Sequence, residues 1–154
     1  MGKSIVIKGA DFAVNAIRTV TLSPIHEEIT DLFIWTNNIS VQINGDEGST
    51  TFYKSSGFVD VSRYAKIVVA QPMYRVGPIT NGYPAICFYD QNKTVISGKH
   101  YRVSDISGQP STEMYEYILP EGTKYIRTNY FLESYEEQWP EGHFLPFRCI
   151  GYIE

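Results

Sequence analysis

The fold is indicated most clearly by residues 84–97, which read PAICFYDQNKTVIS. Two apolar arms, Pro84 to Tyr89 and Thr94 to Ser97, flank the polar residues Asp90-Gln91-Asn92-Lys93. A short polar turn between two apolar runs is typical of a β-hairpin. We therefore predict two antiparallel strands joined by a four-residue turn.

The composition extends this prediction to the whole chain. Among the 154 residues there are 17 Ile, 11 Val and 11 Thr, against only 5 Leu and 6 Ala. Side chains branched at Cβ lose rotamer freedom in helices and pack well on a pleated sheet. The 12 tyrosines and 8 phenylalanines favour strands in the same way. An all-β protein is expected.

Further strand-like segments recur along the chain. A second hairpin is predicted where Glu113 to Leu119 and Lys124 to Phe131 flank Pro120-Glu121-Gly122-Thr123. Other predicted strands are Ser4–Ile7, Ala16–Leu22, Phe58–Val61, Lys66–Ala70 (ended by Pro72, which lacks a backbone donor) and Phe147–Ile153. The length suits one domain. We predict a single antiparallel β-sandwich of jelly-roll type over residues 1–154.

Three kinds of segment break this pattern. Ser23-Pro24 resembles a helix start, and Ile25, Ile29, Leu32 and Phe33 follow at helical spacing. Residues 24–33 are therefore expected to form either a short helix or a loop that leads into a strand at 32–36. Exposed loops are expected at Gly45–Ser49 and Gly77–Gly82, and a long acidic loop at residues 133–146.

The charge balance excludes several classes of protein. There are 13 Lys and Arg residues against 17 Asp and Glu residues, giving a net charge of −4. Nucleic-acid binding and adhesion to anionic membranes both need a basic surplus, so neither partner is expected. No apolar run approaches the ~20 residues that span a bilayer, so membrane insertion is not expected. The opening residues also lack the apolar core of a secretory signal.

Catalytic and metal-binding motifs are incomplete. His26-Glu27-Glu28-Ile29-Thr30 begins like a zinc-protease helix, but Thr30 stands where the second histidine belongs. Residues 45–49, GDEGS, lack the lysine of a phosphate-binding loop. His26, His100 and His143 are far apart, without the spacing of metal ligands. No enzyme activity, metal or cofactor is therefore expected.

The two cysteines are interpreted from their neighbours. Cys87 lies in AICFY and Cys149 in FRCI, both apolar strand-like contexts. Free cysteine is among the most buried residue types, so two core thiols are the favoured interpretation. A disulfide between facing strands is the alternative.

Several aromatic residues fall in or beside predicted loops, where a ring can stack on a sugar and a neighbouring polar group can read its hydroxyls. The candidate carbohydrate-binding residues are Tyr74, Arg75, Tyr83, Tyr101 and Trp139. The alternative is that these residues form protein–protein contacts, in which Tyr, Trp and Arg are also enriched.

The middle of the chain resembles a known group of domains. The order of YKSSGFVDVS (53–62), AICFYD (85–90), VISG (95–98) and LPEGTKYIR (119–127) is similar to that of jelly-roll, carbohydrate-binding-module-like domains. Such domains occur in proteins of gut Bacteroidetes and in virion proteins of their phages. The resemblance covers about half the chain and carries no catalytic residues with it.

The resemblance implies a function outside catalysis. We expect a virion surface protein of a bacteriophage, located on the particle or otherwise extracellular, in capsid decoration or a fibre, with glycan adhesion as a further role. Its expected partners are other virion proteins, a cell-surface glycan, and further copies of itself in a homo-oligomer such as a trimer. One alternative is a carbohydrate-binding module of a secreted bacterial protein. Another is a small hydrolase with an unrecognised acid/base pair.

Overall fold

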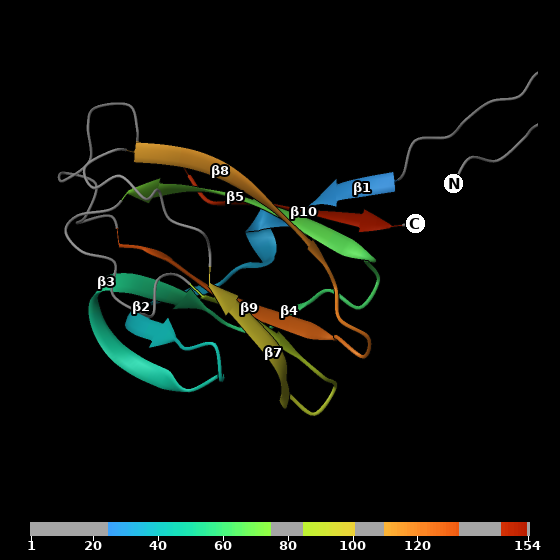
Figure 1. Cartoon of the computed structure of the whole chain (residues 1–154), viewed down its shortest axis with the longest axis horizontal. Helices are drawn as coiled ribbons and strands as arrows, with labels where there is room; N and C mark the ends of the chain where they lie inside the picture. The colour runs from blue at the N-terminus through green and yellow to red at the C-terminus, as the bar shows by residue number, and fades with distance from the viewer. Residues whose placement is uncertain (1–24, 75–84, 101–109, 133–145, 154) are drawn as a thin grey trace, which may run out of the picture.

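The computed structural model describes residues 25–74, 85–100, 110–132 and 146–153, and these are built almost entirely of strands (Figure 1). The strands are β1 (Ile25–Glu28), β2 (Trp35–Val41), β3 (Glu47–Ser56), β4 (Val59–Asp60), β5 (Lys66–Tyr74), β6 (Ala85–Tyr89), β7 (Val95–His100), β8 (Pro110–Ile118), β9 (Tyr125–Phe131) and β10 (Arg148–Ile153). A short 3-10 helix, η1 (Thr30–Leu32), links β1 to β2. The all-β prediction is confirmed.

The strands form two sheets that face each other, as Figure 1 shows. Sheet I has the order β1-β10-β5-β8, and sheet II has the order β2-β3-β9-β6-β7, with β4 paired to β9. Every pairing is antiparallel. Strands that follow one another along the chain often belong to opposite sheets, as β8, β9 and β10 do. This interleaved order is that of a jelly roll, as the sequence predicted.

The main core fills the space between the sheets. Ile67 and Val69 of β5, Ile86 and Phe88 of β6, and Ile126 of β9 point into it and are at most 1% exposed. Because successive side chains of a strand point to opposite faces, these alternating positions commit one face of each sheet to the core. Burial of each such side chain contributes roughly 1.5–3 kcal/mol.

A second, smaller core lies on the outer face of sheet II. Val41, Cys87 and Tyr89 are buried there beneath the connection between β2 and β3. The Cys87 thiol donates a hydrogen bond to the Gln42 carbonyl oxygen at 2.9 Å. Cys149 lies in the main core instead, so the two sulfur atoms face different cores and both thiols are free. The interpretation of two buried thiols is confirmed, and the alternative disulfide is wrong.

The predicted hairpin around residues 85–97 is confirmed, because β6 pairs with β7. The second predicted hairpin is wrong. β8 pairs with β5 in sheet I, whereas β9 pairs with β3 and β6 in sheet II. The Pro120–Thr123 turn, closed by a 3.1 Å hydrogen bond from Thr123 N to Pro120 O, therefore carries the chain from one sheet to the other. A turn between two apolar segments looks the same in sequence whether the strands pair or separate.

Other predicted boundaries also need correction. Ile25–Glu28 form β1 and only Thr30–Leu32 form the 3-10 helix η1, so the predicted short helix over residues 24–33 is wrong. Glu47 to Ser49 belong to β3 and are not an exposed loop. β5 continues past Pro72, which pairs with Thr112 of β8. The described pairing of β10 with β5 stops at Ala70, so the missing N–H of Pro72 interrupts no described ladder on that side. Predictions for 4–7, 16–22, 77–82 and 133–145 lie outside the described residues.

Candidate functional site

An open groove lies on the surface where β2 and β3 separate. Its lining residues are Asn38, Ser49, Thr50, Thr51 and Phe52. Its volume of about 600 Å³ falls within the range of roughly 300–1,000 Å³ found for small-ligand sites. The groove is broad and shallow, as suits a ligand that approaches from solvent.

A break in strand pairing creates this groove. Asn37 of β2 is opposite Lys54 of β3, but Ile39, two residues further on, is opposite Ser49. Residues 50–53 of β3 are thus left opposite a single residue, Asn38, whose φ of 63° lies in the left-handed region. Asn tolerates that conformation better than most residues with a side chain. The extra length of β3 swings outward and forms the groove wall.

Hydrogen bonds fix the outward segment in place. Phe52 N donates to Thr50 Oγ1 at 3.1 Å, and Leu132 N donates to Phe52 O at 3.0 Å. The neighbouring residue, Tyr53, is buried and packs its ring 5.1 Å from that of Phe131. The Phe52 side chain, which points the other way, remains 45% exposed. The backbone is therefore held at both sides of an exposed aromatic ring.

The lining has the chemistry of a site for an uncharged, hydroxyl-rich ligand. The Phe52 ring offers an apolar surface, while three hydroxyls and one carboxamide offer both donors and acceptors. None of the five lining residues carries a charge. A sugar presents an apolar C–H face and a rim of hydroxyls, and this combination matches both features of the groove.

The groove lies beside the end of the sandwich where three undescribed segments are attached. Leu132, bonded to Phe52, immediately precedes residues 133–145, which include Trp139. At the same end, the last residue of β5, Tyr74, is paired with the first residue of β8, Pro110 (Figure 1). The first residue of β6, Ala85, is likewise paired with the last residue of β7, His100.

None of the five predicted site residues has a described side chain. Tyr74 ends β5, but its side chain lies outside the described part of the structure, as do Arg75, Tyr83, Tyr101 and Trp139. Their attachment points converge although they are widely separated in sequence. Contacts among these five side chains remain a prediction.

The groove residues were missed by sequence reasoning. Ser49-Thr50-Thr51-Phe52 alternates too weakly to identify an exposed ring, and Asn38 has no neighbouring glycine or proline to mark a bulge. The available signal was compositional: three small hydroxyl side chains directly precede an aromatic residue. Only the pairing break explains why that ring is exposed.

A second group of rings and cations lies outside the lining of the groove. Lys93 Nζ and the Arg127 guanidinium carbon lie 4.8 and 5.1 Å from the centroid of the Phe58 ring, which is 37% exposed. Arg127 also forms a 2.7 Å ion pair with Glu47. Cations therefore cover the Phe58 ring, which makes it poorly suited to stacking a neutral sugar.

Two of the described carboxylates, Glu28 and Asp60, have structural partners. Arg148 donates hydrogen bonds to Glu28 and lowers the pKa of its carboxyl, and Ser62 does the same for Asp60. Both shifts are opposite in direction to those that prepare a carboxyl as a general acid. His26 is exposed, with its ring 5.5 Å from that of Tyr152. Within the described ranges, no three His, Cys, Asp or Glu side chains are grouped to hold a metal ion.

Comparison of the chain with models of protein families, with curated proteins and with solved structures gives no match. The part of the chain described by the structure contains no helix long and apolar enough to cross a membrane. The arguments for function therefore depend on the fold and the groove.

Proposed function

We propose that this protein is a non-catalytic adhesion protein that binds a neutral glycan in the groove beside Phe52, and that it serves on the surface of a phage particle. The observation that carries the proposal is the uncharged groove, in which a half-exposed ring is surrounded by hydroxyl and amide groups. The jelly-roll fold agrees with the sequence resemblance to virion and carbohydrate-binding-module-like domains. The virion location itself depends on that resemblance.

The alternative, a carbohydrate-binding module of a secreted bacterial protein, would use the same groove. The two settings differ in assembly, because a virion component is expected to form a homo-oligomer, such as a trimer, and to contact other virion proteins. Measuring the mass of the chain in solution by light scattering distinguishes them. A stable oligomer supports the particle role, and a monomer that binds glycan supports the isolated module.

The proposal is tested by removing the ring. Phe52→Ala should weaken binding to the recognised glycan at least tenfold, which corresponds to about 1.4 kcal/mol, because the sugar loses its apolar platform. Phe58→Ala is the matched control, since it removes a ring of similar exposure that does not line the groove. Affinities are measured by calorimetric titration, and thermal melting verifies that both variants are folded.

Equal affinity of the Phe52→Ala variant and the unmodified protein would place the binding site elsewhere. A loss of affinity in Phe58→Ala alone would point to the group of rings and cations around Phe58. Either result would overturn the assignment of the groove.

A further inference from the structure

The far half of the β2–β3 hairpin is separated from the rest of sheet II. Beyond Asn38, Ile39–Val41 pair with Glu47–Ser49. We call residues 39–49 the distal hairpin. In the described part of the chain, the pairing of β3 with β9 is confined to Tyr53–Ser55. The distal hairpin therefore shares no strand ladder with a described strand outside itself.

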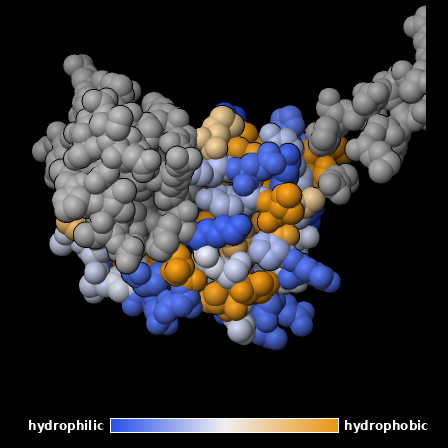
Figure 2. Space-filling view, in the orientation of Figure 1, coloured by the Kyte–Doolittle hydropathy of each residue, from blue (hydrophilic) through white to orange (hydrophobic). Residues whose placement is uncertain are grey.

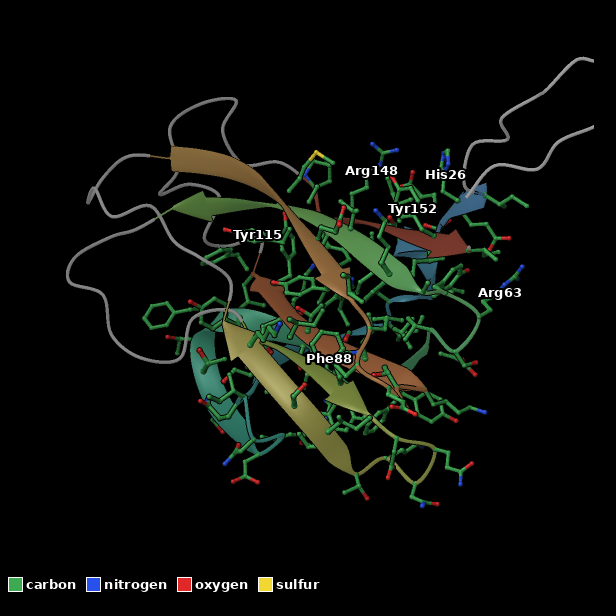
Figure 3. All side chains as sticks on the ribbon, turned by 45° about the vertical axis from the view of Figure 1, so that its right-hand side comes forward. His26, Arg63, Phe88, Tyr115, Arg148 and Tyr152 are labelled. Atoms are coloured by element: carbon green, nitrogen blue, oxygen red, sulfur yellow. The ribbon has the colours of Figure 1, made fainter. Side chains whose placement is uncertain are left out.

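The distal hairpin lies over the outer face of sheet II. Figure 3 shows Phe88 of β6 between the two sheets, so its neighbours Cys87 and Tyr89 point to the opposite face. There they are buried together with Val41 of the distal hairpin. The described part of the distal hairpin thus contributes one buried apolar side chain to this small core.

Side chains, rather than a ladder, hold the distal hairpin on the sheet. The Asn129 carboxamide accepts a hydrogen bond from Val41 N at 2.8 Å and donates one to Val41 O at 2.9 Å. Arg127 forms a 2.7 Å ion pair with Glu47, and the Cys87 thiol donates its hydrogen bond to the turn. These contacts can break together without disturbing the pairing of β9 with its neighbours in the sheet.

Surface hydrophobicity does not distinguish the distal hairpin from other elements. Figure 2 shows apolar patches scattered among polar residues over the described surface on that side. Ile43 in the turn of the distal hairpin is 42% exposed, whereas Ile34, outside it, is 73% exposed. The distinguishing features are the break in strand pairing at its base and the small core beneath it.

We infer that the distal hairpin is a hinged lid, which opens as a unit at Asn38 and residues 50–51 while the rest of the sandwich stays folded. Parts of a native structure that bury little apolar surface open at a lower free energy than the whole molecule. Phe52 O accepts a hydrogen bond from Leu132 N, so the hinge lies on the hairpin side of Phe52. Opening uncovers the Cys87 thiol.

Opening of the distal hairpin also changes the groove. Ser49 moves with the distal hairpin, whereas Phe52 is fixed to the sheet, and both line the groove. The groove therefore keeps its shape only when the distal hairpin is closed, and a ligand held there favours the closed state. This regulation of the groove rests on the proposed glycan binding, whereas the opening itself does not.

The experiment is labelling of both thiols of the folded 154-residue chain with iodoacetamide, followed by peptide mass spectrometry. Cys87 should react at least tenfold faster than Cys149, which lies in the main core. Glu47→Gln should speed the labelling of Cys87 at least threefold, because it removes the ion pair to β9. Glu116→Gln is the matched control, because it removes an ion pair of similar carboxylate exposure in sheet I. Thermal melting verifies that each variant is folded.

Hydrogen exchange measured by mass spectrometry is a second test that does not depend on the thiols. Backbone amides of the distal hairpin should exchange faster than those of β9, because they become exposed without unfolding of the sandwich. The recognised glycan at saturating concentration should slow both this exchange and the labelling of Cys87.

Three results would overturn the opening of the distal hairpin. Cys87 and Cys149 could react at the same rate, which would mean that only global unfolding exposes them. Glu116→Gln could speed the labelling of Cys87 as much as Glu47→Gln does. The amides of the distal hairpin could be as protected as those of β9.

Two further results concern the groove alone. Bound glycan that leaves the labelling of Cys87 unchanged would overturn the regulation of the groove while the proposed glycan binding stands. A chain that binds no glycan would overturn both the proposed function and this regulation, but not the opening.

Discussion

Cys149 illustrates how a single buried side chain couples the stability of this fold to pH. It lies in the main core, and burial raises the pKa of its thiol from 9.0 to about 12. Below pH 9 the thiol is protonated in both the folded and the unfolded chain, so it contributes no pH dependence. Between pH 9 and 12 the unfolded chain loses this proton while the folded chain keeps it. Ionisation thus favours unfolding as the pH rises.

We therefore predict that the midpoint temperature of thermal unfolding decreases as the pH is raised from 8 to 10.5. Burial also raises the pKa of Tyr117 and acts in the same direction at the upper end of this interval. The measurement is thermal unfolding followed by circular dichroism across the pH series. Cys149→Ala is the control, because it removes the titrating thiol and should reduce the slope even if its midpoint is lower throughout. A midpoint independent of pH up to 10.5 would contradict this account.

Asn38 is the residue on which the candidate site depends. Its left-handed backbone conformation ends one stretch of β2–β3 pairing and begins the next. Because of this single position, residues 50–53 of β3 have no residue of β2 opposite them except Asn38. The sequence does not reveal this change, because neither a glycine nor a proline lies next to Asn38.

At the scale of elements, the connection between β2 and β3 covers part of sheet II. Gly98 of β7 allows the backbone of this connection to approach, because a Cβ built at Gly98 would lie only 2.1 Å from the Ile43 carbonyl oxygen. That neighbour is backbone, so it cannot rotate away. The second core of Val41, Cys87 and Tyr89 depends on this close contact.

Gly98→Ala should therefore destabilise the protein by about 1–3 kcal/mol, the usual cost of overpacking. The measurement is the free energy of unfolding from denaturant titration. Gly48→Ala in β3 of the same sheet is the matched control, because its Cβ would lie 4.0 Å from Ser40 Oγ and meet no other atom within 4 Å. If both variants lose the same stability, the close approach of residues 42–46 to β7 is not as described.

The elements also show how far sequence reasoning extends. The β6–β7 hairpin and strands β9 and β10 were predictable, because their apolar alternation and turn residues are local signals. The pairing of β8 with β5 was not, since strands 40 residues apart carry no local mark of their partner. The β2–β3 hairpin was missed because four of the five residues from Thr36 to Ser40 are polar. Its burial of Cys87 comes from tertiary structure.

The candidate site was predictable only in kind. Sequence reasoning expected an aromatic ring with polar neighbours in loops, and the groove has that chemistry but uses Phe52 and Asn38 within strands. The pairing break that exposes Phe52 results from tertiary structure. Tyr74, Arg75, Tyr83, Tyr101 and Trp139, the residues expected from the sequence, have no described side chains, so their part in a binding site stays a prediction.

At the scale of the whole molecule, the jelly roll separates two surfaces by their chemistry. The groove on sheet II is uncharged and hydroxyl-rich, whereas the outer face of sheet I combines internal ion pairs with exposed apolar side chains. The uncharged groove is therefore the surface on which the proposed glycan binding depends.

A glycan array probed with the purified 154-residue chain tests the assignment of the groove most directly. Binding to one class of neutral glycan is expected, with inhibition by the free sugar and little response to sulfated or sialylated glycans. A silent array, or binding confined to anionic glycans, would contradict the assignment of the uncharged groove beside Phe52 as a glycan-binding site.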